Sequence, residues 1–415
     1  PTAGEKRLKR VLEVGSLRGF GLESGERLVG MAGALLSYVE TTQKAALHHL
    51  RSFVRRSAGD SLVIDRASLR NLEVERSADG SNNTSLLAVL DHSSTRMGTR
   101  LLRDWITVPS IDIEEIGERQ RAVAELVEDA DLLGAMGAAL DGLPDLERLG
   151  GRIGLAMATP RELMGLRTAI DLLPGVAEAA ARATSPRMRR LAAILDPLAD
   201  LGEILHLRLA DEPPPAVGPG VIADGWDAEL DEQRQLTRGG KELLAGIESA
   251  ERERTGISKL KIKYNKVFGY FIEISKANLD RIPDDYDRRQ TLTNAERFIT
   301  PELKELEDQV TGSEEKSKAL EYELFQGLRE EVIKATDRVQ ATARAIAAVD
   351  VITSLAEAAA ERGYKRPTLR AESVLDIIDG RHPVLDALMA DEPFVPNDTS
   401  LNVTDNQVAI ITGPN

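Results

Sequence analysis

The segment KLKIKYNKVFGYFIEIS, residues Lys259–Ser275, decides the fold because its hydrophobic period is two. Its first half alternates apolar residues with lysines, and its second half repeats the alternation after a short break. Successive side chains of a strand point to opposite faces, so the pattern predicts two half-buried antiparallel strands. The apolar positions are Leu260, Ile262, Tyr264, Tyr270, Ile272 and Ile274.

A charged helical segment precedes these strands. Residues Trp226–Arg254 keep leucine and isoleucine among many glutamates and arginines, which predicts a long, largely solvated helix. We expect an interruption at Gly239-Gly240, because glycine is a poor helix former.

A second long helical segment follows the strands. Thr300 is suited to cap a helix that begins at Pro301, and no further proline occurs before Pro367. Apolar residues recur there at spacings of three and four, and one continuous helix would be roughly 90 Å long. Gly312 and Gly327 are candidate bends. The sequence therefore predicts a small β unit inserted between two long helices.

The chain before this insertion is predicted to be mostly helical. Residues 30–54 have helical periodicity, and successive helices are predicted from Pro109 to about Leu209. Within that stretch, Thr159-Pro160-Arg161-Glu162 has the pattern of a capping box, which predicts a helix start. The proline-rich and glycine-rich segment DEPPPAVGPG at residues 211–220 predicts a connector.

Beyond Pro367 the composition changes to short apolar segments separated by glycine, proline and asparagine. Val374–Ile378 is one such segment, and Val408–Ile411 is predicted to be a buried strand. Together they predict the first strands of an α/β domain.

The composition limits the classes of function. The 415 residues contain no cysteine, which excludes disulfides and thiolate sites and fits a reducing cytoplasm. Five scattered histidines offer no pattern of metal ligands, and no apolar run is long enough to span a membrane. The net charge of −15 excludes a nucleic-acid footprint over the whole surface, so any DNA contact must be confined to a patch.

Such a patch surrounds the predicted strands. Between Ser258 and Thr300 the chain has nine basic and six acidic residues. Lysine and arginine, with polar side chains and backbone N–H groups, make the sequence-independent contacts to DNA. The alternative interpretation is that these lysines form the solvent face of a strand and protect its edge. On charge alone, the alternative is favoured.

The segment IITGPN at residues 410–415 predicts a strand that runs into a turn. Phosphate-binding loops begin in the same way, but their pattern G-x-x-x-x-G-K-[ST] needs a lysine and a hydroxyl further on. Taken alone, an ordinary turn is favoured. Phe394 could stack on a purine or fill a core, and His382 is more typical of a capped turn than of a catalyst.

Together these segments resemble the MutS family of DNA mismatch repair proteins over nearly the whole chain. The order and spacing of the matching segments are highly specific, and IITGPN is similar to the opening of the family's TGPNMGGKS phosphate loop. The segments are LLAVLDHSSTRMGTRLLRDWITVPSID, ERQRAV, TGISKLKIKYNKVFGYFIEISKANL, DYDRRQTLTNAERFITPELKELE, GRHPVLDAL, EPFVPND and IITGPN.

The resemblance implies a mainly α fold with a helical core, two long lever helices, a small antiparallel β clamp inserted at their tip, and the first strands of a truncated α/β ABC-type ATPase domain. It implies the end of a connector domain at residues 1–60. The core would occupy residues 61–240 and 302–366, the clamp residues 241–301, and the start of the ATPase domain residues 367–415.

The resemblance also implies binding residues. In the clamp, Asn294 and Arg297 match a segment that touches the duplex, and Lys276, Arg288 and Arg289 are further DNA-binding candidates. For nucleotide, Phe394 and Val395 match an adenine-contacting stretch, and Gly413, Pro414 and Asn415 match the first residues of the phosphate loop. No catalytic or metal-binding residue of the family falls within the sequence.

The implied activity of the whole protein is recognition of mispaired or looped-out bases in double-stranded DNA, coupled to ATP and Mg²⁺. The family works as a homodimer with a MutL-type repair partner, in the bacterial cytoplasm at the nucleoid. The mismatch-reading wedge and the phosphate-loop lysine fall outside the sequence, so we expect this chain neither to discriminate a mismatch nor to hydrolyse ATP, and to need no cofactor.

Two alternatives remain open. One is a MutS-related protein that binds recombination intermediates or branched DNA. The other is a coiled-coil scaffold whose partners are proteins, which the basic insertion RRQTLTNAER at residues 288–297 disfavours because a scaffold does not need it.

Overall fold

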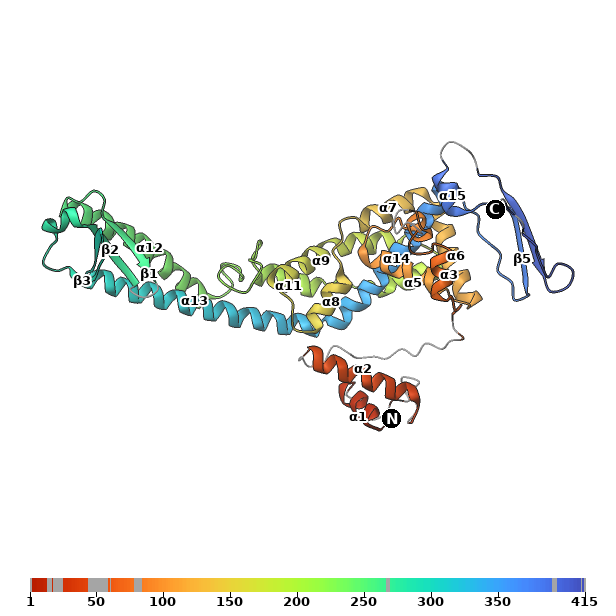
Figure 1. The fold of residues 1–415 in the computed structure, drawn as a ribbon, viewed down its shortest axis with the longest axis horizontal. Helices are drawn as coiled ribbons and strands as arrows, with labels where there is room; N and C mark the ends of the chain where they lie inside the picture. Colours follow the sequence, from red (N-terminus) through yellow and green to blue (C-terminus); the bar gives the residue numbers. More distant parts are fainter. Residues whose placement is uncertain are drawn as a thin grey trace. The chain divides into compact units, whose positions relative to one another are not determined.

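The structure is a computed structural model that describes residues 2–12, 17, 25–43, 59, 61–77, 84–265, 269–389, 394–411 and 413. The chain divides into two compact units. The first comprises Pro1–Ala158, Gly165–Gly202 and Val332–Asn415, and the second comprises Thr159–Met164 and Glu203–Glu331. Most elements are helices, joined by a four-stranded and a two-stranded antiparallel sheet (Figure 1). The predicted mainly α fold with a small β insertion is confirmed.

The first unit is built mostly from helices of 5 to 27 residues. Three further helices, α9 (Pro160–Ala181), α11 (Ala199–Arg208) and α13 (Pro301–Lys334), have residues in both units. The helices within the first unit are α1 (Thr2–Val11), α2 (Arg27–Gln43), α3 (Arg66–Asn71), α4 (Leu86–Leu90), α5 (Arg96–Thr107), α6 (Ile113–Glu128), α7 (Ala130–Leu140), α8 (Leu146–Gly154), α10 (Pro186–Ile194), α14 (Thr336–Arg362) and α15 (Pro383–Leu388).

Helix α14 is the centre of the first unit. It packs against α5, α6, α7, α8 and α10, and side chains on all of its faces are buried. Many of these residues are alanines, whose short side chains let neighbouring helices approach closely. A helix that is apolar all round belongs in the middle of a bundle, and α14 has that place.

Two buried polar side chains of α14 form hydrogen bonds with the loop that precedes α5. Asp350 accepts hydrogen bonds from the backbone N–H groups of Ser94 (3.0 Å) and Thr95 (2.8 Å) and from the Thr95 hydroxyl (2.5 Å). Ser354 accepts one from the backbone N–H of His92 (2.8 Å). A Cβ atom at Gly98 would overlap the Asp350 carboxylate, so glycine is required there. Helix α14 thereby fixes the loop that leads into α5, and the Thr95 hydroxyl caps the first turn by accepting from the N–H of Gly98 (3.0 Å).

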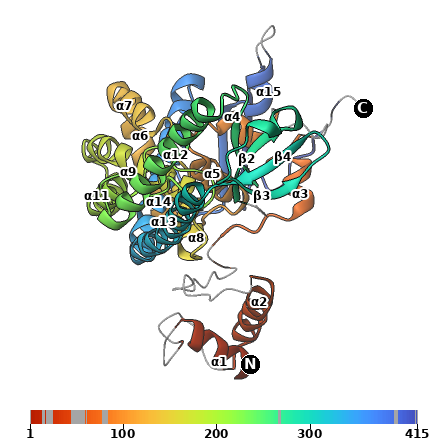
Figure 2. The same cartoon turned by 90° about the vertical axis from the view of Figure 1, so that its left-hand side faces the viewer.

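The second unit contains the predicted β insertion. Its sheet has the order β1-β2-β4-β3 with every neighbouring pair antiparallel, and Figures 1 and 2 show it beside the ends of two long helices. The elements are α12 (Ala228–Thr255), β1 (Lys261–Asn265), β2 (Gly269–Ser275), the 3-10 helix η2 (Lys276–Arg281), β3 (Asp287–Thr291), β4 (Ala295–Ile299) and α13.

The pairing of β1 with β2 confirms the two predicted strands. Ile262 lies opposite Ile272, and Tyr264 lies opposite Tyr270, with ring centroids 5.0 Å apart. Tyr264 is nevertheless 55% exposed, because it lies near the end of the edge strand β1. Strands β3 and β4 were not predicted from the sequence.

One hydrophobic core joins the sheet to both long helices. It combines residues from the second half of α12, from one face of the sheet and from the first turns of α13. The buried members are Leu244, Ile257, Leu260, Ile272, Ile274, Tyr286, Phe298, Ile299, Leu303, Leu306 and Val310. The sheet is thus fixed to α12 and α13 by burial of apolar surface.

The two long helices are confirmed, but the interruption predicted at Gly239-Gly240 is absent from α12. Helix α12 continues through Gly239-Gly240, and α13 continues through Gly312 and Gly327. A Cβ atom at Gly240 would overlap Val310 of α13, so this glycine permits close helix packing. The break comes instead at Ala335, between α13 and α14.

The predicted helix starts are confirmed by hydrogen bonds. The Thr159 hydroxyl accepts from the backbone N–H of Glu162 (3.3 Å), and the Glu162 carboxylate accepts from the backbone N–H of Thr159 (2.8 Å). The Thr300 hydroxyl accepts from the backbone N–H of Leu303 (3.2 Å) at the start of α13. Residues 211–220 form no helix, as predicted for a connector.

The C-terminal segment contains one strand pair. Strand β5 (Val374–Gly380) pairs antiparallel with β6 (Asn397–Asn402). The prediction of a buried strand at Val408–Ile411 was wrong: Val408, Ile410 and Ile411 are 77%, 89% and 91% exposed and lie in no strand. An apolar run becomes a strand only where a neighbour pairs with its backbone, and no described strand does so here.

At the N-terminal end, the helix predicted for residues 30–54 corresponds to α2, which spans Arg27–Gln43. Residues 44–54 of that prediction lie outside the described residues. Helices α1 and α2 share a small core that includes Leu8, Val29 and Leu36. Among the described helices, none combines the length and apolar character needed to cross a membrane.

Candidate nucleic-acid interface

The end of the sheet where β2 stops and β3 turns into β4 brings two of the predicted DNA-binding residues together. The backbone N–H of Lys276 donates to the carbonyl of Asn294 (3.2 Å), and the turn is closed by a bond from the N–H of Leu292 to the carbonyl of Ala295 (2.9 Å). Lys276 and Asn294 are both exposed. The backbones of Lys276 and Asn294 therefore lie side by side at one rim of the sheet, and both residues are open to solvent.

Arg289 lies on the edge strand β3, at an irregularity in its pairing with β4. Arg288 pairs with Phe298 and Gln290 with Arg297, so Arg289 is the extra residue of a bulge. Its side chain is exposed. Among the described residues, neither Arg289 nor Lys276 forms an ion pair, so both charges are available to an anion.

Arg288 is already engaged by a carboxylate. Its Nε atom lies 2.9 Å from Oε2 of Glu296, whose residue is only 5% exposed. Glu296 lies opposite Ile274 on the face of the sheet that carries the hydrophobic core. A buried carboxylate requires such a partner, so Arg288 stabilises the sheet by neutralising Glu296.

Arg297 lies on the opposite face, within a polar network. Its Nη1 donates to Gln290 (2.7 Å), its Nε is 3.5 Å from Glu273, and its guanidinium carbon lies 4.3 Å from the ring centroid of Phe271. Lys263 donates to Glu273 as well (2.7 Å), and Lys263, followed by Arg297, lowers the pKa of that carboxyl. The Arg297 side chain is only 18% exposed.

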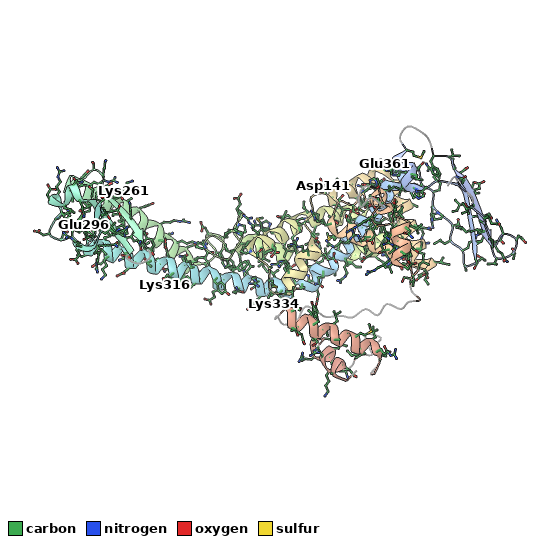
Figure 3. The ribbon with its side chains drawn as sticks, viewed as in Figure 1. Asp141, Lys261, Glu296, Lys316, Lys334 and Glu361 are labelled. Carbon is green, nitrogen blue, oxygen red and sulfur yellow. The ribbon has the colours of Figure 1, made fainter. Side chains whose placement is uncertain are left out.

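The structure thus divides the predicted DNA-binding residues into two groups. Lys276, Arg289 and Asn294 are exposed, and neither of the two charged residues among them forms an ion pair within the described part of the chain. Arg288 and Arg297, in contrast, are paired with Glu296 and Glu273. Figure 3 shows the side chains of this sheet, with Lys261 and Glu296 labelled. Free lysine, arginine and asparagine side chains at a sheet rim can contact phosphates without reading sequence.

The sequence did not reveal the residues that hold this sheet in place. Glu248 accepts from the backbone N–H of Ile262 (2.8 Å), and Arg252 donates to the carbonyl of Leu260 (2.8 Å), so α12 satisfies the outer edge of β1. Glu248 and Arg252 are four residues apart, a spacing that in sequence indicates only an ordinary helix-surface pair.

A second anchor joins α12 to the segment before β3. The hydroxyl of Tyr286 donates to Glu251 (2.7 Å), and Arg254 binds both Glu251 (2.9 Å) and Asp285 (3.0 Å). Burial, followed by the bond to Glu251, raises the pKa of Tyr286. The tyrosine therefore stays neutral and keeps its hydrogen bond at physiological pH.

The predicted nucleotide-binding residues are only partly described. Phe394 is half-buried, Val395 is 76% exposed and Gly413 is exposed, while Pro414 and Asn415 lie outside the described residues. His382 accepts from the backbone N–H of Leu385 (3.3 Å) and caps α15, which confirms the interpretation as a capped turn. Among the described residues, no group of three histidine, aspartate or glutamate side chains is placed to hold a metal ion.

Comparison with known proteins agrees with this architecture. The family model "MutS domain III" matches residues 67–356, which include most of α14, both long helices α12 and α13, and the four-stranded sheet. Proteins named DNA mismatch repair protein MutS are 44% identical in Symbiobacterium thermophilum (96% of this chain, 46% of the relative), 44% in Myxococcus xanthus (100% and 47%) and 40% in Alkaliphilus oremlandii (98% and 47%). The chain spans about half the length of these curated relatives. The chain belongs to the MutS family.

Proposed function

We propose that this chain supplies the helical core and a DNA-backbone clamp of a DNA mismatch repair protein. The whole protein would recognise mispaired or looped-out bases in duplex DNA and couple that recognition to ATP binding and hydrolysis. The observation that carries the proposal is the MutS domain III match over residues 67–356, which encloses the helices and the sheet together. The relatives' shared name favours mismatch repair over the branched-DNA and scaffold alternatives.

The proposed domain organisation assigns the clamp to residues 241–301 and the core to residues 61–240 and 302–366. Residues 1–60 would close a connector domain, and residues 367–415 would begin an ATPase domain. The extended core shared by α12, the sheet and α13 supports a clamp that moves as one body with the ends of its helices.

Within the clamp, Lys276, Arg289 and Asn294 are proposed as direct contacts to DNA phosphates, because they are exposed and their charges or amide are not paired internally. Arg297 and Arg288 would contribute mainly by holding the rim in shape, with their remaining N–H groups turned to the duplex. Contacts of this kind fix position on the backbone and carry no sequence information.

For the whole protein we propose a nucleotide site to which Phe394 and Val395 contribute adenine contacts and Gly413, Pro414 and Asn415 phosphate contacts, with Mg²⁺ bound by the ATP. The working assembly would be a homodimer that acts with a MutL-type partner in the bacterial cytoplasm at the nucleoid. These roles rest on the family membership and on the positions of the matching segments.

Binding of the 415-residue chain to labelled duplex DNA tests the clamp. Fluorescence anisotropy with a perfectly paired duplex and with the same duplex carrying one mismatch should give weak and equal affinities, because a backbone contact does not read bases. Replacing both Arg289 and Asn294 by alanine should weaken binding to both duplexes by about tenfold. Unchanged affinity in that variant would remove these residues from the interface.

A matched control is available on the same unit. Lys316 and Lys318 are exposed basic residues of α13, 17 and 19 residues beyond Ile299, where the last strand of the sheet ends. Alanine at both positions removes two positive charges, and should leave the affinity within about twofold if the contact is local to the rim of the sheet. The rim variant removes only one positive charge, so a loss in the Lys316/Lys318 variant that equals or exceeds that of the rim variant would show that net charge alone governs binding.

A further inference from the structure

The first unit contains a hollow of about 730 Å³ between α5, α10 and α14. Its size falls within the range of sites that hold small organic ligands. The DNA-binding candidates lie in the second unit, so the proposed clamp does not use this hollow. The lining of the hollow comes from α5, α10 and α14, with Glu147 of α8.

The floor of the hollow is apolar because α14 presents small side chains to it. Ala341, Ala345 and Ala348 follow one another at spacings of four and three, so they share one face of the helix. Their methyl groups leave the space unfilled, and the remaining apolar lining comes from α5 and α10. Ile194 of α10 is 48% exposed at this place. The floor can accept the apolar body of a ligand.

The lining carries more positive than negative charge, with four arginines against two carboxylates. Two of the arginines are neutralised. Arg100 binds Asp145 (2.8 Å) and Glu147 (2.6 Å), and Arg103 lies 3.3 Å from Glu75. Arg187 and Arg344 form no ion pair or hydrogen bond in the described part of the chain, so they provide the unmatched charge.

Arg187 is the more informative of the two. The residue is half-buried. Its Nε–H group is buried from solvent and has no hydrogen-bond acceptor among the described residues. Burial, followed by the charge of nearby Arg119, lowers its pKa, and Glu115 and Glu118 offset only part of that effect. Arginine remains protonated in proteins, so the guanidinium of Arg187 stays charged and keeps N–H donors that no acceptor in the described chain uses. Carboxylates and phosphates fit that fork with two parallel hydrogen bonds.

We propose that this hollow is a binding site for a small organic anion, with its carboxylate or phosphate on Arg187 and Arg344 and its apolar body on the alanine floor of α14. Trp105 forms part of the wall, and its ring already stacks on the guanidinium of Arg119, 3.7 Å from the ring centroid. The proposal stands independently of DNA binding, because no residue of the second unit takes part in it.

Isothermal titration calorimetry of the 415-residue chain with three related probes tests the site. 1-Naphthyl phosphate and 1-naphthoate share an aromatic body with neutral 1-naphthalenemethanol but differ in the charged group. At least one anion should bind saturably, and at least about tenfold more tightly than the neutral alcohol. Preference between the two anions identifies the natural head group. Equal affinity for the alcohol, or no saturable binding of either anion, would overturn the proposal.

Substitutions then locate the binding. Arg187→Ala should lower the affinity for the preferred anion by about tenfold or more. Arg344→Ala should lower it in the same way, and because Arg344 is exposed this substitution should not disturb folding. Arg189→Ala is the matched control, because Arg189 is an exposed arginine of the same helix α10 outside the hollow. Ala341→Leu should block binding of all probes by filling the floor. Undiminished binding in the Arg187, Arg344 and Ala341 variants would place the anion elsewhere.

Discussion

At the scale of single residues, Glu321 shows how the second unit secures its least regular segment. This carboxylate of α13 is completely buried and accepts hydrogen bonds from the backbone N–H groups of Gly220 (2.9 Å), Val221 (3.0 Å) and Ile222 (3.0 Å). The guanidinium of Arg234 completes its environment. A buried charge is tolerated only when it is paired and fully hydrogen-bonded, and Glu321 meets both conditions. The end of the proline-rich connector is therefore attached to α13 by one side chain.

Replacing Glu321 by alanine should destabilise the chain by about 3–5 kcal/mol, because three backbone N–H groups would lose their acceptor and Arg234 would lose its buried partner, while keeping Asp224, Asp231 and the Ile222 carbonyl. Urea denaturation followed by circular dichroism measures this loss. Glu323→Ala is the matched control, since Glu323 is an exposed glutamate of the same helix, and its change should stay within about 0.5 kcal/mol. Similar effects of the two substitutions would contradict the role given to Glu321.

At the scale of elements, the neighbouring glycines of α12 make opposite predictions. Nothing lies within 4 Å of a Cβ atom at Gly239, whereas one at Gly240 would overlap Val310 of α13. Gly239→Ala should stabilise the helix by about 0.5–1 kcal/mol through reduced backbone entropy of the unfolded chain. Gly240→Ala should instead destabilise it by about 1–3 kcal/mol through overpacking. Denaturation curves for the two variants give the comparison, and effects of the same sign would refute the close approach of α12 and α13.

A second prediction at this scale concerns pH and the attachment of α14 to the first turn of α11 and the segment before it. Arg338 binds Asp196 (2.7 and 3.1 Å) and Asp200 (2.8 and 2.9 Å) with both sides of its guanidinium. Arg338 holds the pKa of both carboxyls below the usual 3.8. A lowered folded-state pKa adds stability above the unfolded value, and that stability is lost as the pH falls through the folded value.

Arg338→Ala should therefore lower stability at neutral pH, by on the order of 1 kcal/mol once solvent screening of these partly exposed groups is considered. The difference from the unmodified chain should shrink as the pH falls below about 4, where the carboxyls become protonated in both. Thermal melts across that pH range measure it. Arg344→Ala, an unpaired arginine of the same helix, should show no such trend, and a pH-independent difference for Arg338→Ala would exclude the ionic mechanism.

The sequence predicted those elements whose pattern is set locally. Alternation identified β1 and β2, and capping residues located the starts of α9 and α13. Strand β3 was missed because DRRQT has no apolar residue, and its place depends on pairing with β4. Strand β4 was obscured because a glutamate, Glu296, occupies a core-facing position and is compensated by Arg288 from the neighbouring strand. Such compensation arises only in the folded chain.

The candidate site was less accessible to prediction for the same reason. A list of basic residues does not distinguish Arg289, which is free of ion pairs among the described residues, from Arg297, which lies in a network with Glu273 and Gln290. That distinction depends on strand register, which the sequence did not provide. The anchors Glu248 and Tyr286 were likewise invisible, because their partners are 14 and 35 residues away in the chain.

At the scale of the whole molecule, the central question is how a chain of net charge −15 holds a polyanion. General repulsion opposes the association, so attraction has to come from a few well-placed cations at short range. Lys276 and Asn294 at the rim and Arg289 on the edge strand meet that requirement, because Glu273 and Glu296 of the same sheet are occupied by other arginines and a lysine. A local phosphate contact predicts a shallow but definite dependence of affinity on salt.

The most direct test of the DNA clamp is the slope of log affinity for a paired duplex against log salt concentration, between about 50 and 200 mM. The unmodified chain should give a negative slope, and Lys276→Ala with Arg289→Ala should make it less steep by about two, one for each lost phosphate contact. Lys316→Ala with Lys318→Ala should leave the slope unchanged. A slope that is the same in the unmodified chain and the Lys276/Arg289 variant would contradict the assignment of this sheet as the DNA-binding surface.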